Sequence, residues 1–281
     1  MLGKLIKYDL KSMSKAFVPM WILAPVIALL LSFSIRGTIA WANSSMMGRM
    51  MGAGNGILMV VMLLLFISAI IGLFVMTVVF VIQRFWNGLL KEEGYLMFTL
   101  PVKTWELIVS KALTATLISC MSILMGIFSG MILAVFSTEE VVRSLAVAWK
   151  YVLSSMIDVG PVFWINLILF IMLTILGTVG SIYHVYAAMA VGHLFQTHKV
   201  VGSCVAYIAM SVAVSIIGNI ISTVMNIILP DNWSYYYWVG SSRNDAFSVM
   251  YLLYLILAEI LQIIVMHVIT ERILSTKLNL E

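Results

Sequence analysis

The sequence predicts an all-α membrane protein with six transmembrane helices. Of its 281 residues, 63% are hydrophobic and only 10% are charged, and the mean hydropathy is +1.10. Soluble domains carry about 25% charged residues, so the composition indicates a polytopic membrane protein. Short polar segments separate six apolar runs, each long enough to cross a bilayer. We expect a single transmembrane domain over residues 1–281, with spans at about 17–35, 56–82, 107–136, 161–189, 200–229 and 247–269.

The N-terminal segment, residues 1–15, has the pattern of an amphipathic helix. Its lysines alternate with apolar residues, which recur at spacings of three and four: Leu2, Ile6, Leu10, Met13 and then Phe17. We expect an interfacial helix that lies on the inner membrane surface and anchors the first span. A positively charged flank with no further role explains the lysines equally well.

A charged and aromatic loop, residues 83–111, interrupts the apolar sequence after the second span. Its first part, Arg84 to Glu93, can form a short helix that ends at Gly94, a residue suited to the left-handed C-terminal position. Thr104 can cap the helix that begins the third span. A short helix in this place would lie across the inner face and transmit a push from a soluble partner into the helix bundle. The alternative is an ordinary interfacial loop.

An outer segment follows the third span. Ser137 and Glu140 have the spacing of a capping box, and the apolar residues after them repeat at helical period until Gly160 and Pro161. We therefore expect an outer amphipathic helix over residues 137–158. It would act either as a substrate gate or as a connector that rests on lipid headgroups.

The basic residues indicate the orientation. Eleven of the 16 Lys and Arg residues lie in the predicted inner segments and five in the outer ones. Because inner loops of membrane proteins carry an excess of Lys and Arg, both termini are expected in the cytoplasm. The net charge of +4 is spread over short loops instead of forming one basic patch, so we expect no nucleic-acid partner.

Two polar features lie inside the predicted spans. Glu259 falls near the middle of the sixth span, where a charge costs about 3 kcal/mol on insertion scales. It indicates proton or ion coupling, a polar substrate pathway that includes Asn219, or a carboxyl group hydrogen-bonded to a neighbouring helix. One face of the fifth span is small and polar, which is typical of close helix packing and predicts a subunit interface. The residues of this face are Ser211, Ser215, Gly218, Ser222 and Asn226.

Common catalytic motifs are missing from the sequence. It has neither a Gly-x-x-x-x-Gly-Lys-Ser/Thr phosphate loop nor a His-Glu-x-x-His motif. Cys120 and Cys204 lie in apolar runs and make no disulfide or metal framework. His184, His193 and His198 lack a convincing set of metal ligands. We expect no catalytic residue, cofactor or metal in this chain itself.

The two inner loops resemble those of a known family. The first inner loop resembles the cytoplasmic loop of bacterial ABC transporter permeases of the ABC-2 type, particularly small ones from Firmicutes. The residues that carry this resemblance are Arg84-Phe85, Leu89-Leu90 and Glu92-Glu93-Gly94-Tyr95-Leu96-Met97-Phe98-Thr99-Leu100-Pro101-Val102. The second inner loop is similar through Gly192, His193, Phe195 and Lys199. Six spans and small outer loops agree over nearly the whole chain, but the outer helix is more prominent than the family pattern demands.

The resemblance implies a permease subunit in a bacterial cytoplasmic membrane. It would work with a second permease copy or paralogue and with two copies of a separate ATPase subunit, which would bind ATP and Mg. The segment from Arg84 to Glu93 would be the coupling helix, with Glu92, Glu93 and Gly94 as contact and hinge next to Tyr95. The first and fifth spans would meet their counterparts across the dimer axis. The complex would export a lipophilic or amphipathic molecule, such as an antimicrobial peptide, a drug or a lipid.

Two other classes of function stay open on the sequence. A proton-coupled secondary carrier would be built around Glu259, although the hydropathy profile shows no two inverted halves. A membrane sensor or scaffold would move no cargo at all. Cargo, direction of transport and the choice between homodimer and heterodimer have no signature in the sequence.

Overall fold

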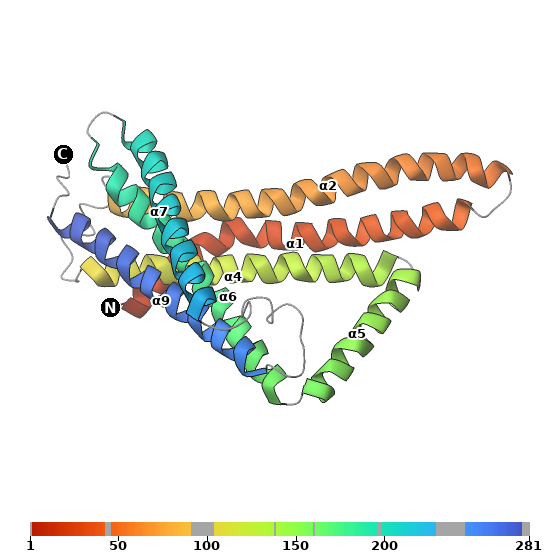
Figure 1. The fold of residues 1–281 in the computed structure, drawn as a ribbon. Coiled ribbons are helices and arrows are strands. Elements are labelled where there is room, and N and C mark those ends of the chain that lie inside the picture. Colours follow the sequence, from red (N-terminus) through yellow and green to blue (C-terminus); the bar gives the residue numbers. More distant parts are fainter. Residues whose placement is uncertain are drawn as a thin grey trace. The chain divides into compact units, whose positions relative to one another are not determined.

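Seven α-helices and one short π-helix make up the described part of the computed structural model, which comprises residues 2–42, 46–90, 104–137, 139–159, 161–195, 198–228 and 245–276. These residues contain no strand, and the all-α class is confirmed (Figure 1). The elements are α1 Leu2–Ala42, α2 Met46–Phe85, η1 Trp86–Leu90, α4 Thr104–Ser137, α5 Glu139–Val159, α6 Pro161–Gly192, α7 Lys199–Ile228 and α9 Asp245–Thr276.

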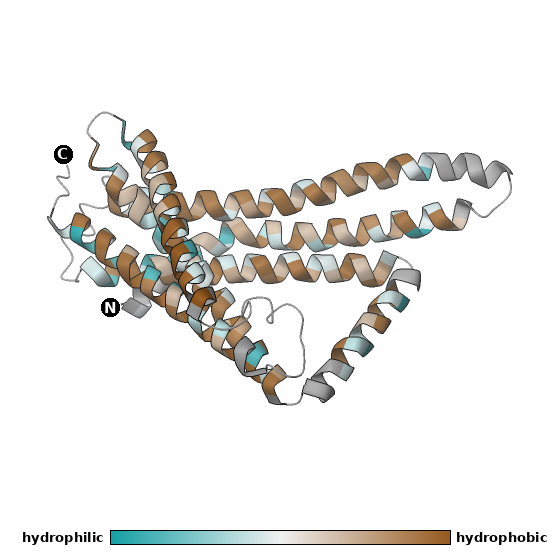
Figure 2. Ribbon diagram, in the orientation of Figure 1, coloured by the Kyte–Doolittle hydropathy of each residue, from teal (hydrophilic) through white to brown (hydrophobic). Residues whose placement is uncertain are grey.

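Six of these helices are long and apolar enough to cross a membrane, and they coincide with the six predicted spans. Figure 2 shows that apolar residues cover most of their length, whereas α5 alternates between polar and apolar residues. Large apolar side chains lie exposed on their surfaces, among them Ile57 and Phe74. Apolar surface of this extent is expected where lipid is the solvent. The chain is a multi-pass membrane protein. The apolar stretches are Lys7–Ala40, Gly54–Leu90, Thr104–Ser137, Val162–Gly192, Lys199–Val224 and Val249–Thr276.

The chain divides into two compact units, and each is described by itself. Unit 1 comprises Met1–Ile6, Val81–Thr116 and Ser155–Glu281, and unit 2 comprises Lys7–Phe80 and Leu117–Ser154.

In unit 2, α1, α2 and α4 run side by side (Figure 1). The buried side chains of Met13 and Phe17 on α1 pack with Ile118 of α4, and the Phe17 ring lies edge-on to Phe80 of α2 at 5.1 Å. The helix α1 continues from Leu2 to Ala42 without a break, so the segment predicted as an interfacial helix and the first span form one helix. From Met13 onward, its apolar stripe faces other helices of the protein.

A small polar network joins the same three helices. The Trp21 Nε1 of α1 donates a hydrogen bond to the Ser122 Oγ of α4 at 3.1 Å, and the Thr77 Oγ1 of α2 approaches the same oxygen at 3.3 Å. Lipid gives helices no hydrophobic reason to associate, so van der Waals packing and interhelical hydrogen bonds of this kind hold them together. The network therefore fixes the register of the three helices.

The corner between α4 and α5 differs from the prediction. Ser137 is the last residue of α4, and its hydroxyl donates to the Ala134 carbonyl of that helix at 3.2 Å. The capping box predicted for Ser137 and Glu140 is therefore wrong, because the hydroxyl turns back into the preceding helix. The helix predicted over residues 137–158 exists as α5, and its described side chains are exposed from Val142 to Ser154. Its place on the outer face stays a prediction.

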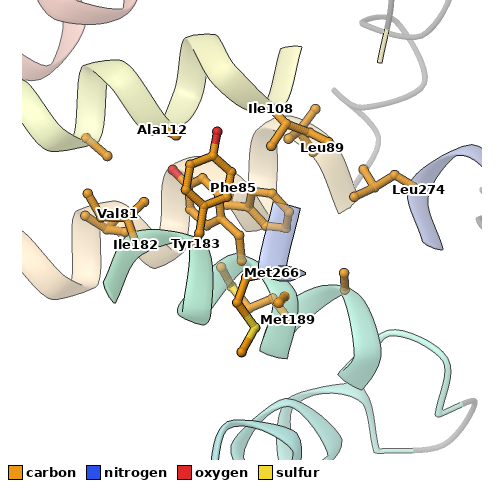
Figure 3. Close-up of a cluster of buried hydrophobic side chains, with 14 of the residues drawn as sticks. Val81, Phe85, Leu89, Ile108, Ala112, Ile182, Tyr183, Met189, Met266 and Leu274 are labelled. Carbon is orange, nitrogen blue, oxygen red and sulfur yellow. The ribbon is translucent and has the colours of Figure 1, made fainter. Parts of the chain in front are cut away.

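In unit 1, α6 is the central helix and packs against both α7 and α9. The largest buried cluster lies where the last turns of α2, the first turns of α4 and the C-terminal parts of α6 and α9 converge (Figure 3). Its side chains include Val81, Phe85 and Leu89 from the α2–η1 segment, together with Ile108, Tyr186 and Met266. This cluster supports both predicted inner loops.

Candidate functional site

The end of α2 has an irregular geometry. The α-helix ends at Phe85, and Trp86–Leu90 continue as a π-helix, in which Gly88, Leu89 and Leu90 are buried. Single π-turns of this type occur mostly at functional sites. The sequence pattern predicted a return to the cytoplasm at Gln83 and a separate short helix from Arg84. The separate helix is wrong, because the helical backbone continues from α2 to Leu90 without a turn. The return to the cytoplasm at Gln83 stays a prediction.

Phe85 anchors this segment in the buried cluster of unit 1. Its ring stacks on Tyr186 of α6 with a centroid distance of 4.1 Å and an interplanar angle of 21°, and neither side chain is accessible to solvent. Stacked aromatic pairs are worth about 1 kcal/mol beyond the area that they bury. Of the residues predicted to couple to an ATPase, Phe85, Leu89 and Leu90 therefore face the interior of unit 1, where they support the segment.

The exposed part of the segment is small. Arg84 and Trp86 are half-buried, and Asn87 is exposed. Glu92, Glu93, Gly94 and Tyr95 lie outside the described residues, so their roles as contact and hinge stay predictions.

The predicted second inner loop begins with a tight turn at residues 193–195, directly after α6. Three backbone hydrogen bonds end α6, from the amides of His193, Leu194 and Phe195 to the carbonyls of Met189, Val191 and Gly192. A Cβ on Gly192 would overlap the backbone nitrogen, Cα and hydroxyl of Ser203 in α7. A Cβ on Gly202 would lie 2.6 Å from the Phe195 ring. Glycine is required at both positions because the two helices approach closely there.

The two predicted inner loops meet at His193. The His193 ring lies 6.2 Å from the Trp86 ring, centroid to centroid, and close to the backbone of Leu90. Burial lowers the pKa of His193 and the nearby Lys199 ammonium lowers it further, while the backbone hydrogen bonds oppose both effects. The η1 segment and the end of α6 therefore lie in contact at His193.

A buried lysine, which was not predicted from the sequence, lies beneath the π-helix. Lys111 of α4 is only 1% exposed, and its Cε and Nζ would lie 3.5 and 3.6 Å from a Cβ on Gly88. Gly88 leaves room for this ammonium group under the η1 backbone. From the sequence, Lys111 was expected to be one of the charges of the loop at residues 83–111. Only its position one helical turn after Leu107 and Ile108 indicated an inward direction.

The predicted polar site around Glu259 faces α6. A Cβ on Gly180 would lie 2.6 Å from the Glu259 Oε2, and this oxygen is buried without a hydrogen-bond partner among the described residues. Farther along α9, the His267 Nε2 lies 3.7 Å from the Glu271 Oε2. Asn219, the other residue of the predicted substrate pathway, has an exposed side chain on α7.

The small-residue face of α7 divides into two parts. The His184 Nε2 of α6 lies 3.0 Å from the Ser211 Oγ, so the first member of the face packs inside unit 1. Ser215 and Gly218 are exposed, and Ser222 is half-buried, whereas the side chain of Asn226 lies outside the description. A Cβ on Gly218 would meet no atom of the described chain within 4 Å. This part of the face is available to a second subunit.

Comparison with protein families, curated proteins and solved structures identifies no relative. No family model, curated protein or solved structure matches this chain. The likeness to ABC-2 permeases thus rests on the two inner loops. Within the described residues, no three His, Cys, Asp or Glu side chains gather as metal ligands.

The pKa of His193 leads to a pH prediction. A folded histidine with a lowered pKa binds its proton less readily than the unfolded chain, so stability rises with pH between the two pKa values. His193 stabilises the fold fully above its ordinary value of 6.5 and progressively less as the pH falls below it. We expect the thermal unfolding midpoint of the purified chain to decrease when the pH is lowered from 7.5 to 5.5. In His193→Gln this decrease should be smaller. The exposed His198 of the same loop gives the control: if His198→Gln reduces the decrease as much, His193 is not its source.

Proposed function

We propose that the chain is the transmembrane permease subunit of an ATP-binding cassette transporter that exports a lipophilic or amphipathic molecule. A separate ATPase subunit, present in two copies, supplies the energy from ATP and Mg. The permease pairs with a second copy or a paralogue through the exposed part of the α7 face. It is placed in a bacterial cytoplasmic membrane with both termini in the cytoplasm.

The observation that carries this proposal is the contact between the two inner loops. An ATPase that moves the segment after Leu90 moves Trp86, and the Trp86 and Leu90 contacts with His193 pass this movement to α6. Since α6 packs against both α7 and α9, one displacement reaches three membrane helices. An inner loop that served only as a connector would need no such contact. The loop motif and the absent phosphate loop support the same assignment.

Co-purification tests the proposal directly. The tagged chain, extracted from its native membrane in a mild detergent, should bring an ATPase with it, identified by mass spectrometry. Addition of the permease should change the hydrolysis rate of that ATPase. The proposal fails if repeated preparations contain no ATPase, or if the ATPase that is present hydrolyses ATP at the same rate without the permease.

Substitution of Trp86 tests the coupling path. We expect Trp86→Ala to leave the complex assembled but to reduce the permease-dependent change in ATP hydrolysis about tenfold, as for a lost coupling energy of ~1.4 kcal/mol. Trp105→Ala is the matched control, because Trp105 is an exposed tryptophan at the start of α4. Equal hydrolysis in the two variants would remove Trp86 from the path.

A proton-coupled carrier is the second candidate, and the unpartnered Glu259 Oε2 favours it. A carboxyl group in a membrane span is expected to mark a proton or substrate pathway. In vesicles that contain only this chain, such a carrier would transport in response to a pH gradient without ATP. Glu259→Gln would then abolish the dependence on the gradient. Transport that needs ATP and is unchanged in Glu259→Gln would exclude this candidate.

A further inference from the structure

A hollow of about 500 Å³ opens in unit 2 at the corner between α4 and α5. Among the residues whose side chains the structure describes, its lining combines two guanidinium groups with three apolar side chains: Arg36, Val135, Phe136, Val142 and Arg143. Neither the inner loops nor the Glu259 site has a part in it. The combination of paired cations with an apolar wall suits a ligand that has an anionic head and an apolar body.

The backbone holds Arg36 in place. Its Nε donates a hydrogen bond to the Ser137 carbonyl at 3.3 Å, which ties the end of α1 to the last residue of α4. This bond uses one of the five N–H donors of the guanidinium and fixes the plane of the group. A guanidinium of fixed orientation is well suited to bind a phosphate through two parallel hydrogen bonds.

The hollow lies at the depth of lipid headgroups. The apolar run of α1 begins at Phe17 and ends just before Arg36. At a rise of about 1.5 Å per residue this run is about 29 Å long, close to the thickness of the hydrocarbon core. Arg36 therefore lies at one surface of the core. The side chains of Val135 and Phe136, 49% and 42% exposed, lie within reach of acyl chains at the same end of the unit.

We infer that this hollow binds the phosphate headgroup of an anionic phospholipid between Arg36 and Arg143, with the acyl chains against Val135 and Phe136. A zwitterionic lipid carries its own positive group toward the two arginines and binds less well. With the N-terminus in the cytoplasm, this lipid belongs to the outer leaflet. The inference goes beyond the proposed function, because lipid binding needs neither an ATPase nor a cargo.

Native mass spectrometry of the purified full chain tests the inference. Phosphatidylglycerol and phosphatidylcholine with the same acyl chains are titrated against the wild type, Arg36→Gln, Arg143→Gln and Lys150→Gln. In each arginine variant, we expect the ratio of the affinities for phosphatidylglycerol and phosphatidylcholine to be about fivefold lower than in the wild type. This is the effect of one basic residue near an anionic surface. Lys150→Gln, which removes one exposed charge from the same helix, should keep the wild-type preference.

Two further measurements make the result decisive. A phosphatidylglycerol with a photoreactive acyl chain should crosslink to residues around 135–142, in the wild type and in Arg143→Lys, and this readout does not depend on stability. Excess inorganic phosphate should not displace the lipid. An equal loss of preference in Lys150→Gln would show that general surface charge binds the lipid and would overturn the inference. Displacement by inorganic phosphate, or crosslinks only elsewhere, would also overturn it.

Discussion

Gly192→Ala is expected to destabilise the chain strongly, by about 3 kcal/mol, the upper part of the range for overpacking. The new methyl group would overlap the backbone nitrogen and Cα of Ser203, and backbone atoms cannot rotate away as a flexible side chain can. Relief would require α6 and α7 to separate at the turn that carries His193. We expect a lower midpoint of thermal unfolding in detergent and a smaller yield of monodisperse protein.

Gly177→Ala is the matched control on the same helix. A Cβ at Gly177 would meet no atom within 4 Å, and alanine is a better helix former than glycine by about 1 kcal/mol. Gly177→Ala should therefore unfold at the wild-type temperature or above it. If both variants unfold at the same temperature, the close approach of Gly192 to Ser203 does not limit stability.

The six spans are predictable from the sequence because each depends on a local property, a long run of apolar residues between polar segments. The predicted and observed helices differ mainly at their ends, as for the first span, predicted at 17–35 and observed within Leu2–Ala42. The helical turns before residue 17 carry lysines, and lysines lower the mean hydropathy from which a span is predicted. A helix nevertheless continues through them, because its backbone hydrogen bonds do not depend on the polarity of the side chains.

Tertiary contacts were the part that local patterns could not supply. Gly192 and His193 were selected by resemblance, but the reason for the glycine lies in Ser203 on the next helix. Nothing near Trp86 distinguishes a π-turn from an α-turn, because the choice depends on the packing of Phe85 and Leu89 into the cluster of unit 1. Lys111 was counted among the charges of the loop at residues 83–111 for a similar reason. A charged side chain is exposed on average, but Lys111 is buried because Gly88 leaves space for it.

Phe85→Ala is expected to have the second large effect, because it removes a fully buried ring where α2 changes into the π-helix. Loss of a buried Phe costs about 3–5 kcal/mol in soluble cores, and in lipid the same van der Waals contacts are the main force between helices. The cavity would also release Leu89 and Trp86 from α6. We expect both a lower unfolding midpoint and a loss of permease-dependent ATP hydrolysis in the complex.

Tyr186→Phe separates packing from polarity at the same contact. It keeps the ring that stacks on Phe85 and removes a buried hydroxyl that has no hydrogen-bond partner among the described residues. Because an unsatisfied buried hydroxyl costs about 1 kcal/mol or more, this variant should be as stable as the wild type or more stable. If Tyr186→Phe loses as much stability as Phe85→Ala, the hydroxyl has a partner in the folded protein, and the stacked rings alone do not hold the η1 segment on α6.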